Sequence, residues 1–129
     1  RDLVRSRGLG DVYKRQELAR VGVQPVLMTL PPIDGARYLD YICRGGLNRD
    51  SIMRWLGDVG CIYRYQELYS DTVASFAMRE GLPLIDVRRR FLPQRDLSEL
   101  ISADGIHLTM PGYRQLFDTL AQWVVPQLA

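Results

Sequence analysis

His107 is the only histidine in the 129-residue chain, and it stands three residues after Asp104 in the segment Asp104-Gly105-Ile106-His107. In a tight loop, an aspartate at this spacing can turn its carboxylate toward the imidazole Nδ1, which fixes the tautomer and leaves Nε2 free to accept a proton. Gly105 relieves the steric cost of such a turn. The spacing therefore predicts a general base at His107 that is oriented by Asp104.

An alternative interpretation stays open, because Asp-x-x-His also arises by chance. In that alternative the chain is a non-catalytic α/β binding module, and Asp104 and His107 only hold a loop in place. A metal site is not expected, since the chain has one histidine and lacks H-x-x-x-H and C-x-x-C spacing. No cofactor is expected either, because the sequence contains neither G-x-G-x-x-G nor a phosphate-binding P-loop motif.

Two short apolar runs, at residues 25–30 and 82–87, are typical of strands that are buried on both faces of a parallel sheet. Helices are expected between and after them. The first two helices are predicted to have Asp34 and Asp50 as their N-caps, and the second is expected to cover residues 51–56. Gly81 is predicted to end a long third helix over residues 62–80. The apolar side chains of that helix are expected to be buried, and they are Tyr65, Tyr69, Val73, Phe76 and Ala77.

A further short helix is expected over residues 95–101, followed by a loop. Thr109 is a suitable N-cap for the last helix, with Pro111 in its first turn. That helix is expected to bury four apolar side chains, Leu116, Phe117, Leu120 and Val124. The alternation of helix and strand indicates an α/β protein, although two strands are fewer than a complete sheet of this class contains.

Asp104-Gly105-Ile106-His107, followed by Pro111-Gly112-Tyr113 and a closing helix, resembles the last conserved block of the SGNH/GDSL serine hydrolases, a family of esterases and lipases. Residues 26–34 and 84–87 look like late strands of the same family, so the resemblance runs from about Leu18 to the C-terminus. It implies a partial flavodoxin-like three-layer α/β/α sandwich with parallel strands, whose N-terminal strands are missing. It also implies that His107 and Asp104 are the base and the acid of a Ser-His-Asp triad acting on a small-molecule ester.

The nucleophile of that family lies in a Gly-Asp-Ser motif, which this sequence lacks: Gly10-Asp11 is followed by Val12, and Gly57-Asp58 by Val59. Gly46-Leu47-Asn48 superficially fits the start of the family's Gly-x-Asn-Asp oxyanion motif, but Arg49 replaces the aspartate. Asn48 is therefore interpreted as a loop or capping residue. The chain is expected to be a fragment of a hydrolase that is inactive alone.

Pro32, Ile33 and Asp34 follow the first predicted strand, so they are candidate substrate-binding residues, with a turn and helix cap as the alternative. Asp86 follows the second strand and has the same two alternatives: contact with a ligand or a hydrogen-bonded turn.

The 17 basic and 15 acidic residues are mostly scattered, so nucleic-acid binding has little support, and the triplet Arg88-Arg89-Arg90 is interpreted as a solvated surface. Cys43 and Cys61 form neither a disulfide framework nor a metal cluster. No membrane span is expected. A cytoplasmic location is favoured over export, and the oligomeric state stays open. Residues 1–16 resemble a translated sequencing-adapter tail and are expected to be non-native or disordered, which leaves residues 17–129 as the hydrolase portion.

Overall fold

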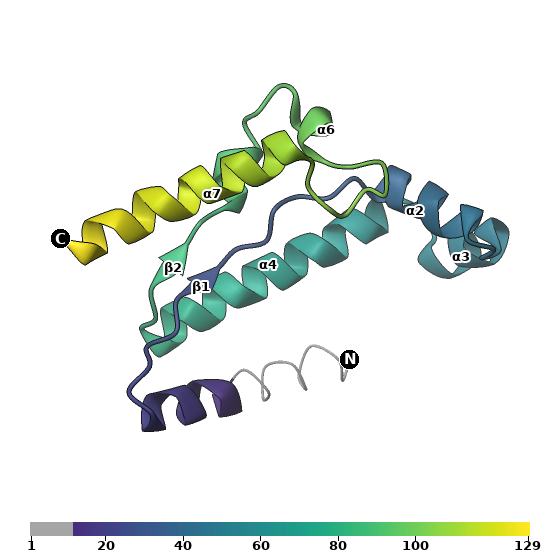
Figure 1. Cartoon of the computed structure of the whole chain (residues 1–129). Coiled ribbons are helices and arrows are strands. Elements are labelled where there is room, and N and C mark those ends of the chain that lie inside the picture. The colour runs from purple at the N-terminus through teal and green to yellow at the C-terminus, as the bar shows by residue number, and fades with distance from the viewer. Residues whose placement is uncertain (1–11) are drawn as a thin grey trace.

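The computed structural model describes residues 12–129 of the chain (Figure 1). Residues 12–20 form a helix, and Gly22 follows it with a positive φ of 72°, as expected for a helix stop. The remaining elements are, in chain order, β1 (Leu27–Met28), α2 (Gly35–Arg44), α3 (Arg49–Leu56), α4 (Gly60–Glu80), β2 (Leu84–Ile85), α5 (Arg88–Phe91), α6 (Leu97–Leu100), α7 (Met110–Val124) and the 3-10 helix η1 (Val125–Leu128).

The expected flavodoxin-like α/β/α sandwich is wrong for this chain. The described part is 64% helix and 5% strand, and its one sheet consists of β1 and β2. The two predicted runs do pair in parallel, with Leu27 opposite Leu84 and Met28 opposite Ile85. Prolines bound the first run, at Pro25 and Pro31, and one lies near the start of the second, at Pro83. The second strand also ends early because Val87 already has helical dihedral angles, which turns the chain out of the sheet.

The small sheet lies between α4 and α7, and Figure 1 shows these two long helices on opposite sides of it. The core is centred where β2 and α5 meet α7. Val87 and Phe91 are fully inaccessible to solvent there. The other buried members of the cluster are Ile85, Leu100 and Leu108, with Met28, Leu97, Leu116, Leu120 and Trp123 packed around them. This cluster fixes both ends of the segment that joins α6 to α7.

The structure also corrects the second expected cap and the expected buried face of α4. The helix α3 begins two residues earlier than predicted, and Asn48, not Asp50, accepts a 2.8 Å hydrogen bond from the backbone N–H of Ser51. In α4 the buried residues are Ser70, Phe76 and Ala77, whereas Tyr65 is 52% exposed. The stripe of α4 is therefore buried only toward its C-terminal half, where the two strands cover it.

The helix α7 starts as the sequence predicts, with the Thr109 hydroxyl accepting a hydrogen bond from the backbone N–H of Gly112. Its expected buried face is wrong in part. Leu116 and Leu120 pack against the core, but Phe117 is 69% exposed and Val124 is exposed as well. Within residues 12–129, no element covers that side of α7, so an apolar stripe of Met110, Tyr113, Phe117 and Val124 faces solvent.

The interpretation of the arginine triplet as a solvated surface is wrong for Arg88, which is 7% exposed. Its guanidinium lies 5.2 Å from the centre of the Tyr63 ring, and its Nη1 donates to the side chain of Gln66 at 2.6 Å and to the carbonyl of Leu30 at 3.3 Å. The Gln66 amide in turn donates to the carbonyl of Pro31 at 2.5 Å. These contacts fix the path of the chain as it leaves β1 toward α2.

Of the N-terminal tail expected at residues 1–16, residues 1–11 lie outside the described part. Residues 12–16 are helical, and Arg15 forms an ion pair with Glu80 at the end of α4. Among the described helices, none has both the length and the apolar character that a membrane-spanning helix requires.

Candidate functional site

The loop that carries Asp104 and His107 joins α6 to α7 and is closed at its base by backbone contacts. Ile101 and Leu108 form an isolated antiparallel bridge, and the N–H of Ser102 donates to the carbonyl of His107 at 2.8 Å. Just below, the N–H of Thr109 donates to the carbonyl of Leu100 at 3.0 Å. Because Leu100, Ile101 and Leu108 are buried, the base of the loop is anchored in the core.

At the tip of this loop the structure brings together the two residues expected to act as acid and base. The Nδ1 atom of His107 lies 2.5 Å from Oδ2 of Asp104, a short hydrogen bond between the ring and the carboxylate. With the carboxylate ionised, this contact places the ring proton on Nδ1 and leaves Nε2 without a proton in the neutral imidazole. The geometry is that of the base and orienting acid in a Ser-His-Asp triad.

The second carboxylate oxygen of Asp104 is held by three donors. Its Oδ1 accepts hydrogen bonds from the Ser102 hydroxyl at 2.6 Å and from the backbone N–H groups of Ile106 and His107, both at 3.0 Å. These bonds stabilise the charged form, so the pKa of Asp104 lies well below its usual range, first because of the Ser102 hydroxyl and then because of the donors of His107 and Ile106. The carboxylate is therefore ionised at neutral pH.

The two side chains differ in exposure. The side chain of Asp104 is 19% exposed, whereas that of His107 is 67% exposed. In the described part of the chain, Nε2 of His107 makes no hydrogen bond. The arrangement thus presents the basic nitrogen to solvent while the carboxylate is held inside the turn.

The tip of this loop contacts the start of α2. Figure 1 shows the segment after α6 running across the molecule to α2. The carbonyl of Gly105 accepts a 2.8 Å hydrogen bond from the backbone N–H of Asp34. Gly105 has a φ of +80°, and a Cβ atom there would lie 2.4 Å from both the carbonyl oxygen of Asp34 and the N–H nitrogen of Tyr38. Only glycine permits this backbone approach.

The candidate substrate-binding residues Pro32, Ile33 and Asp34 lie on the segment under the loop tip. Pro32 is fully inaccessible to solvent, and Ile33 is half-buried. The carboxylate of Asp34 caps α2 by accepting from the backbone N–H of Arg37 at 3.0 Å, which is the alternative that the sequence left open for it. Of these three residues, Asp34 contacts the loop, through the hydrogen bond from its backbone N–H to the carbonyl of Gly105.

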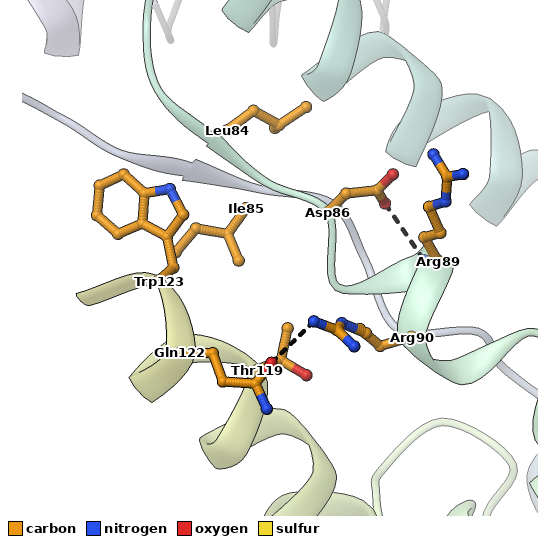
Figure 2. A pocket seen from close by; sticks show the side chains of 8 residues that line it. All are labelled: Leu84, Ile85, Asp86, Arg89, Arg90, Thr119, Gln122 and Trp123. Atoms are coloured by element: carbon orange, nitrogen blue, oxygen red, sulfur yellow. Dashed lines mark hydrogen bonds between the residues drawn. The ribbon is translucent and has the colours of Figure 1, made fainter. Parts of the chain in front are cut away.

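Asp86, the other residue with two alternatives, is also a hydrogen-bonded turn residue. Its Oδ1 accepts from the Thr29 hydroxyl at 3.0 Å and from the backbone N–H of Arg89 at 3.2 Å. It borders a cavity of about 500 Å³ beside β2, which Figure 2 shows lined by Leu84, Ile85, Asp86, Arg89, Arg90, Thr119, Gln122 and Trp123. Neither Asp104 nor His107 lines this cavity, so it is not a substrate pocket for that pair.

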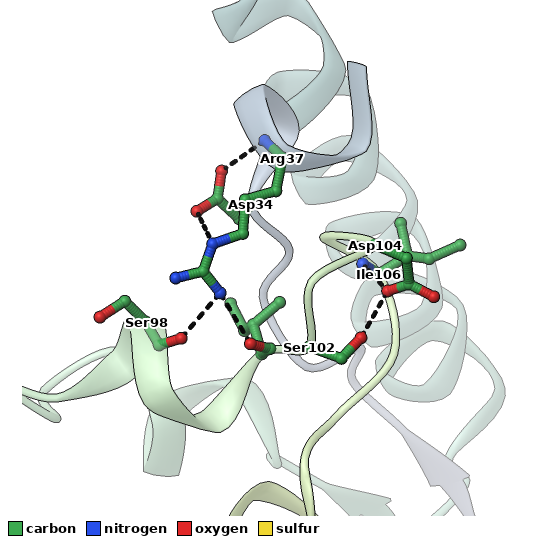
Figure 3. A network of polar contacts seen from close by, with 7 residues as sticks. Asp34, Arg37, Ser98, Ser102, Asp104 and Ile106 are labelled. Carbon is green, nitrogen blue, oxygen red and sulfur yellow. Dashed lines mark hydrogen bonds and ion pairs between the residues drawn. The ribbon is translucent and has the colours of Figure 1, made fainter. Parts of the chain in front are cut away.

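Two further residues of the site, Ser102 and Arg37, were missed by the sequence reasoning. Ser102 supplies the shortest hydrogen bond to Oδ1 of Asp104, and Arg37 joins α2 to the segment that leads into the loop (Figure 3). The serine two residues before the aspartate is a local signal that a turn analysis could have used. The contacts of Arg37 depend on tertiary structure, and no local pattern indicates them.

The chain was compared with protein-family models and with curated proteins, and neither comparison found a match. The comparisons therefore give no support to the hydrolase family that the sequence resembles. Residues 12–129 also contain no group of three or more His, Cys, Asp or Glu side chains placed to hold a metal ion. Cys43 and Cys61 are free thiols.

Proposed function

We propose that this chain supplies the acid and base of a serine ester hydrolase of the SGNH/GDSL type. His107 is the general base, Asp104 orients it, and the serine nucleophile comes from outside this sequence. One observation carries the proposal: the 2.5 Å contact between Nδ1 of His107 and Oδ2 of Asp104, in a loop that leaves the other ring nitrogen open to solvent.

In the proposed reaction, Nε2 of His107 takes the proton of a serine hydroxyl as that oxygen attacks the carbonyl carbon of the ester. The resulting imidazolium gives this proton to the leaving alcohol, and an acyl-serine remains. A water molecule, deprotonated by the same nitrogen, then attacks the acyl carbon, and the imidazolium returns the proton to the serine oxygen as the bond between the acyl carbon and that oxygen breaks and the acid is released. Asp104 stays ionised throughout and stabilises the transient imidazolium, in agreement with its depressed pKa.

The contacts of the loop favour this role over the alternative in which His107 only pins the loop. Three sets of contacts hold the loop without the imidazole ring. They are the backbone bridge of Ile101 and Leu108, the three hydrogen bonds donated to Oδ1 of Asp104, and the backbone contact of Gly105 with α2. A ring that pins a loop is packed against its surroundings, but the ring of His107 is largely exposed. The exposure of the His107 ring therefore favours a catalytic role over a structural role.

The described part of the chain does not complete a triad. The Ser102 hydroxyl is committed to Asp104, and no serine between residues 12 and 129 bonds to His107. Without a nucleophile and its oxyanion donors, which contribute roughly several kcal/mol each to transition-state stabilisation, the isolated chain should have no His107-dependent turnover.

The test compares two proteins: the chain alone, and the chain extended by the coding sequence that precedes it in its source gene. We expect a Gly-Asp-Ser motif in the extension, hydrolysis of p-nitrophenyl esters by the extended protein, and loss of that activity in the His107→Gln variant. Turnover by the isolated chain that depends on His107 contradicts the proposal. So does an extension without a serine motif, or an extended esterase that His107→Gln leaves unchanged.

A further inference from the structure

Arg37 of α2 makes three contacts that link the start of this helix to the base of the loop that carries Asp104 and His107. Its Nε lies 3.3 Å from Oδ2 of Asp34, and its Nη1 donates to two backbone carbonyls, that of Ser98 at 2.8 Å and that of Ile101 at 2.7 Å. Figure 3 shows the guanidinium between the Asp34 carboxylate and the segment that carries Ser98 and Ser102. The two carbonyls belong to α6 and to the residue directly before Ser102.

We propose that Arg37 is a positioning residue for the pair Asp104 and His107. Arg37 does not contact either residue. It fixes Ile101, and Ile101 precedes Ser102, whose hydroxyl is the closest donor to Oδ1 of Asp104. This inference rests on the proposed function for its catalytic meaning, but its structural content is independent of any serine.

A second path leads from Arg37 to the loop through Asp34. The side chain of Asp34 is held by Arg37, and its backbone N–H donates to the carbonyl of Gly105, between Asp104 and His107 in the sequence. Arg37 thus supports the loop both at its base, through Ile101, and at its tip, through Asp34. The loop is held as one unit against the N-terminus of α2.

The role requires a guanidinium and not only a positive charge. A planar guanidinium presents several N–H donors in fixed directions, so one side chain binds the carboxylate and both carbonyls together. A lysine ammonium is a single point of charge and reaches either the carboxylate or the carbonyls. An ordinary partly exposed ion pair between residues three apart in a helix would contribute little to stability and nothing to the geometry of a distant loop.

The single histidine gives a direct readout, because one imidazole produces one set of ring ¹⁵N resonances, whose chemical shifts distinguish the two neutral tautomers. We compare the wild-type chain with Arg37→Met and Arg37→Lys, and with Arg64→Met as the matched control. Arg64 pairs with Asp58 at 2.9 Å on the exposed surface of α4. Circular dichroism and thermal unfolding verify that each variant is folded.

In Arg37→Met we expect the ratio of the Nδ1–H to the Nε2–H tautomer to fall by roughly fivefold or more, the change expected when about one supporting hydrogen bond is lost. In Arg37→Lys the tautomer ratio should fall by a similar factor, and in Arg64→Met it should equal the wild-type ratio. An unchanged ratio in folded Arg37→Met, or full recovery in Arg37→Lys, overturns the proposal. If Arg37→Met does not fold, Arg37→Lys decides alone. Since no turnover is measured, this result stands apart from the esterase test.

Discussion

The backbone N–H of Asp34 donates a 2.8 Å hydrogen bond to the carbonyl of Gly105, which joins the start of α2 to the tip of the loop between α6 and α7. This contact orders the exposed turn that contains the acid and the base. It also explains why the residue that follows Asp104 is a glycine, since the two backbones approach too closely for any Cβ atom.

Substitution Gly105→Ala should destabilise the chain more than Gly81→Ala. Both glycines have positive φ, +80° and +63°, so each alanine incurs a cost of about 1–2 kcal/mol for the left-handed conformation. At Gly81 nothing lies within 4 Å of the added Cβ, whereas at Gly105 two backbone atoms lie at 2.4 Å. Overpacking should add about 1–3 kcal/mol at Gly105, as measured by urea unfolding. Equal costs would show that the close approach is absent in solution.

Substitution Ser102→Ala should raise the pKa of the Asp104 carboxyl toward its usual range. The Ser102 hydroxyl is the first cause of the depressed pKa, through its 2.6 Å hydrogen bond to Oδ1. The measurement is a ¹³C NMR titration of the Asp104 carboxyl group. Ser98→Ala is the control, because Ser98 contributes only its backbone carbonyl to the network. A pKa that stays depressed in Ser102→Ala would remove Ser102 from the site.

The contribution of Asp104 to stability should depend on pH in a defined direction. Its pKa is lower in the folded than in the unfolded chain, so the carboxylate stabilises the fold above the unfolded-state value of about 3.9. This contribution is lost as pH falls toward the folded-state pKa.

The difference in unfolding free energy between the wild type and Asp104→Asn should therefore be constant near neutrality and shrink below about pH 4. Asp118→Asn serves as the control, since the exposed Asp118 side chain makes no hydrogen bond within residues 12–129. A difference between wild type and Asp104→Asn that persists undiminished at pH 2 would mean that charge does not hold the loop.

Local rules predicted the parts of this molecule that depend on near neighbours in the sequence. Asp34 and Thr109 cap α2 and α7 as expected, and Gly81 ends α4 in the left-handed conformation, because each of these interactions spans only a few residues. The contact between Asp104 and His107 was predictable for the same reason. A spacing of three residues with a glycine between them already restricts where the two side chains can meet.

The features that were predicted wrongly or missed depend on tertiary structure. The exposure of Phe117 depends on which elements cover α7, and an amphipathic pattern does not contain that information. Asp50 and Asn48 are equally suitable N-caps by residue type, because both side chains accept the same hydrogen bond, and the structure uses Asn48. Arg37 reaches Ile101 across the fold, so its contribution to the site became visible only with coordinates.

The proposed orientation of His107 by Asp104 can be measured from the ¹⁵N chemical shifts of the two ring nitrogens, at a pH where the imidazole is neutral. We expect the proton to reside on Nδ1, with Nε2 unprotonated, and we expect Asp104→Asn to abolish this preference. If the ring carries its proton on Nε2, in the same proportion in wild type and Asp104→Asn, Asp104 does not orient His107.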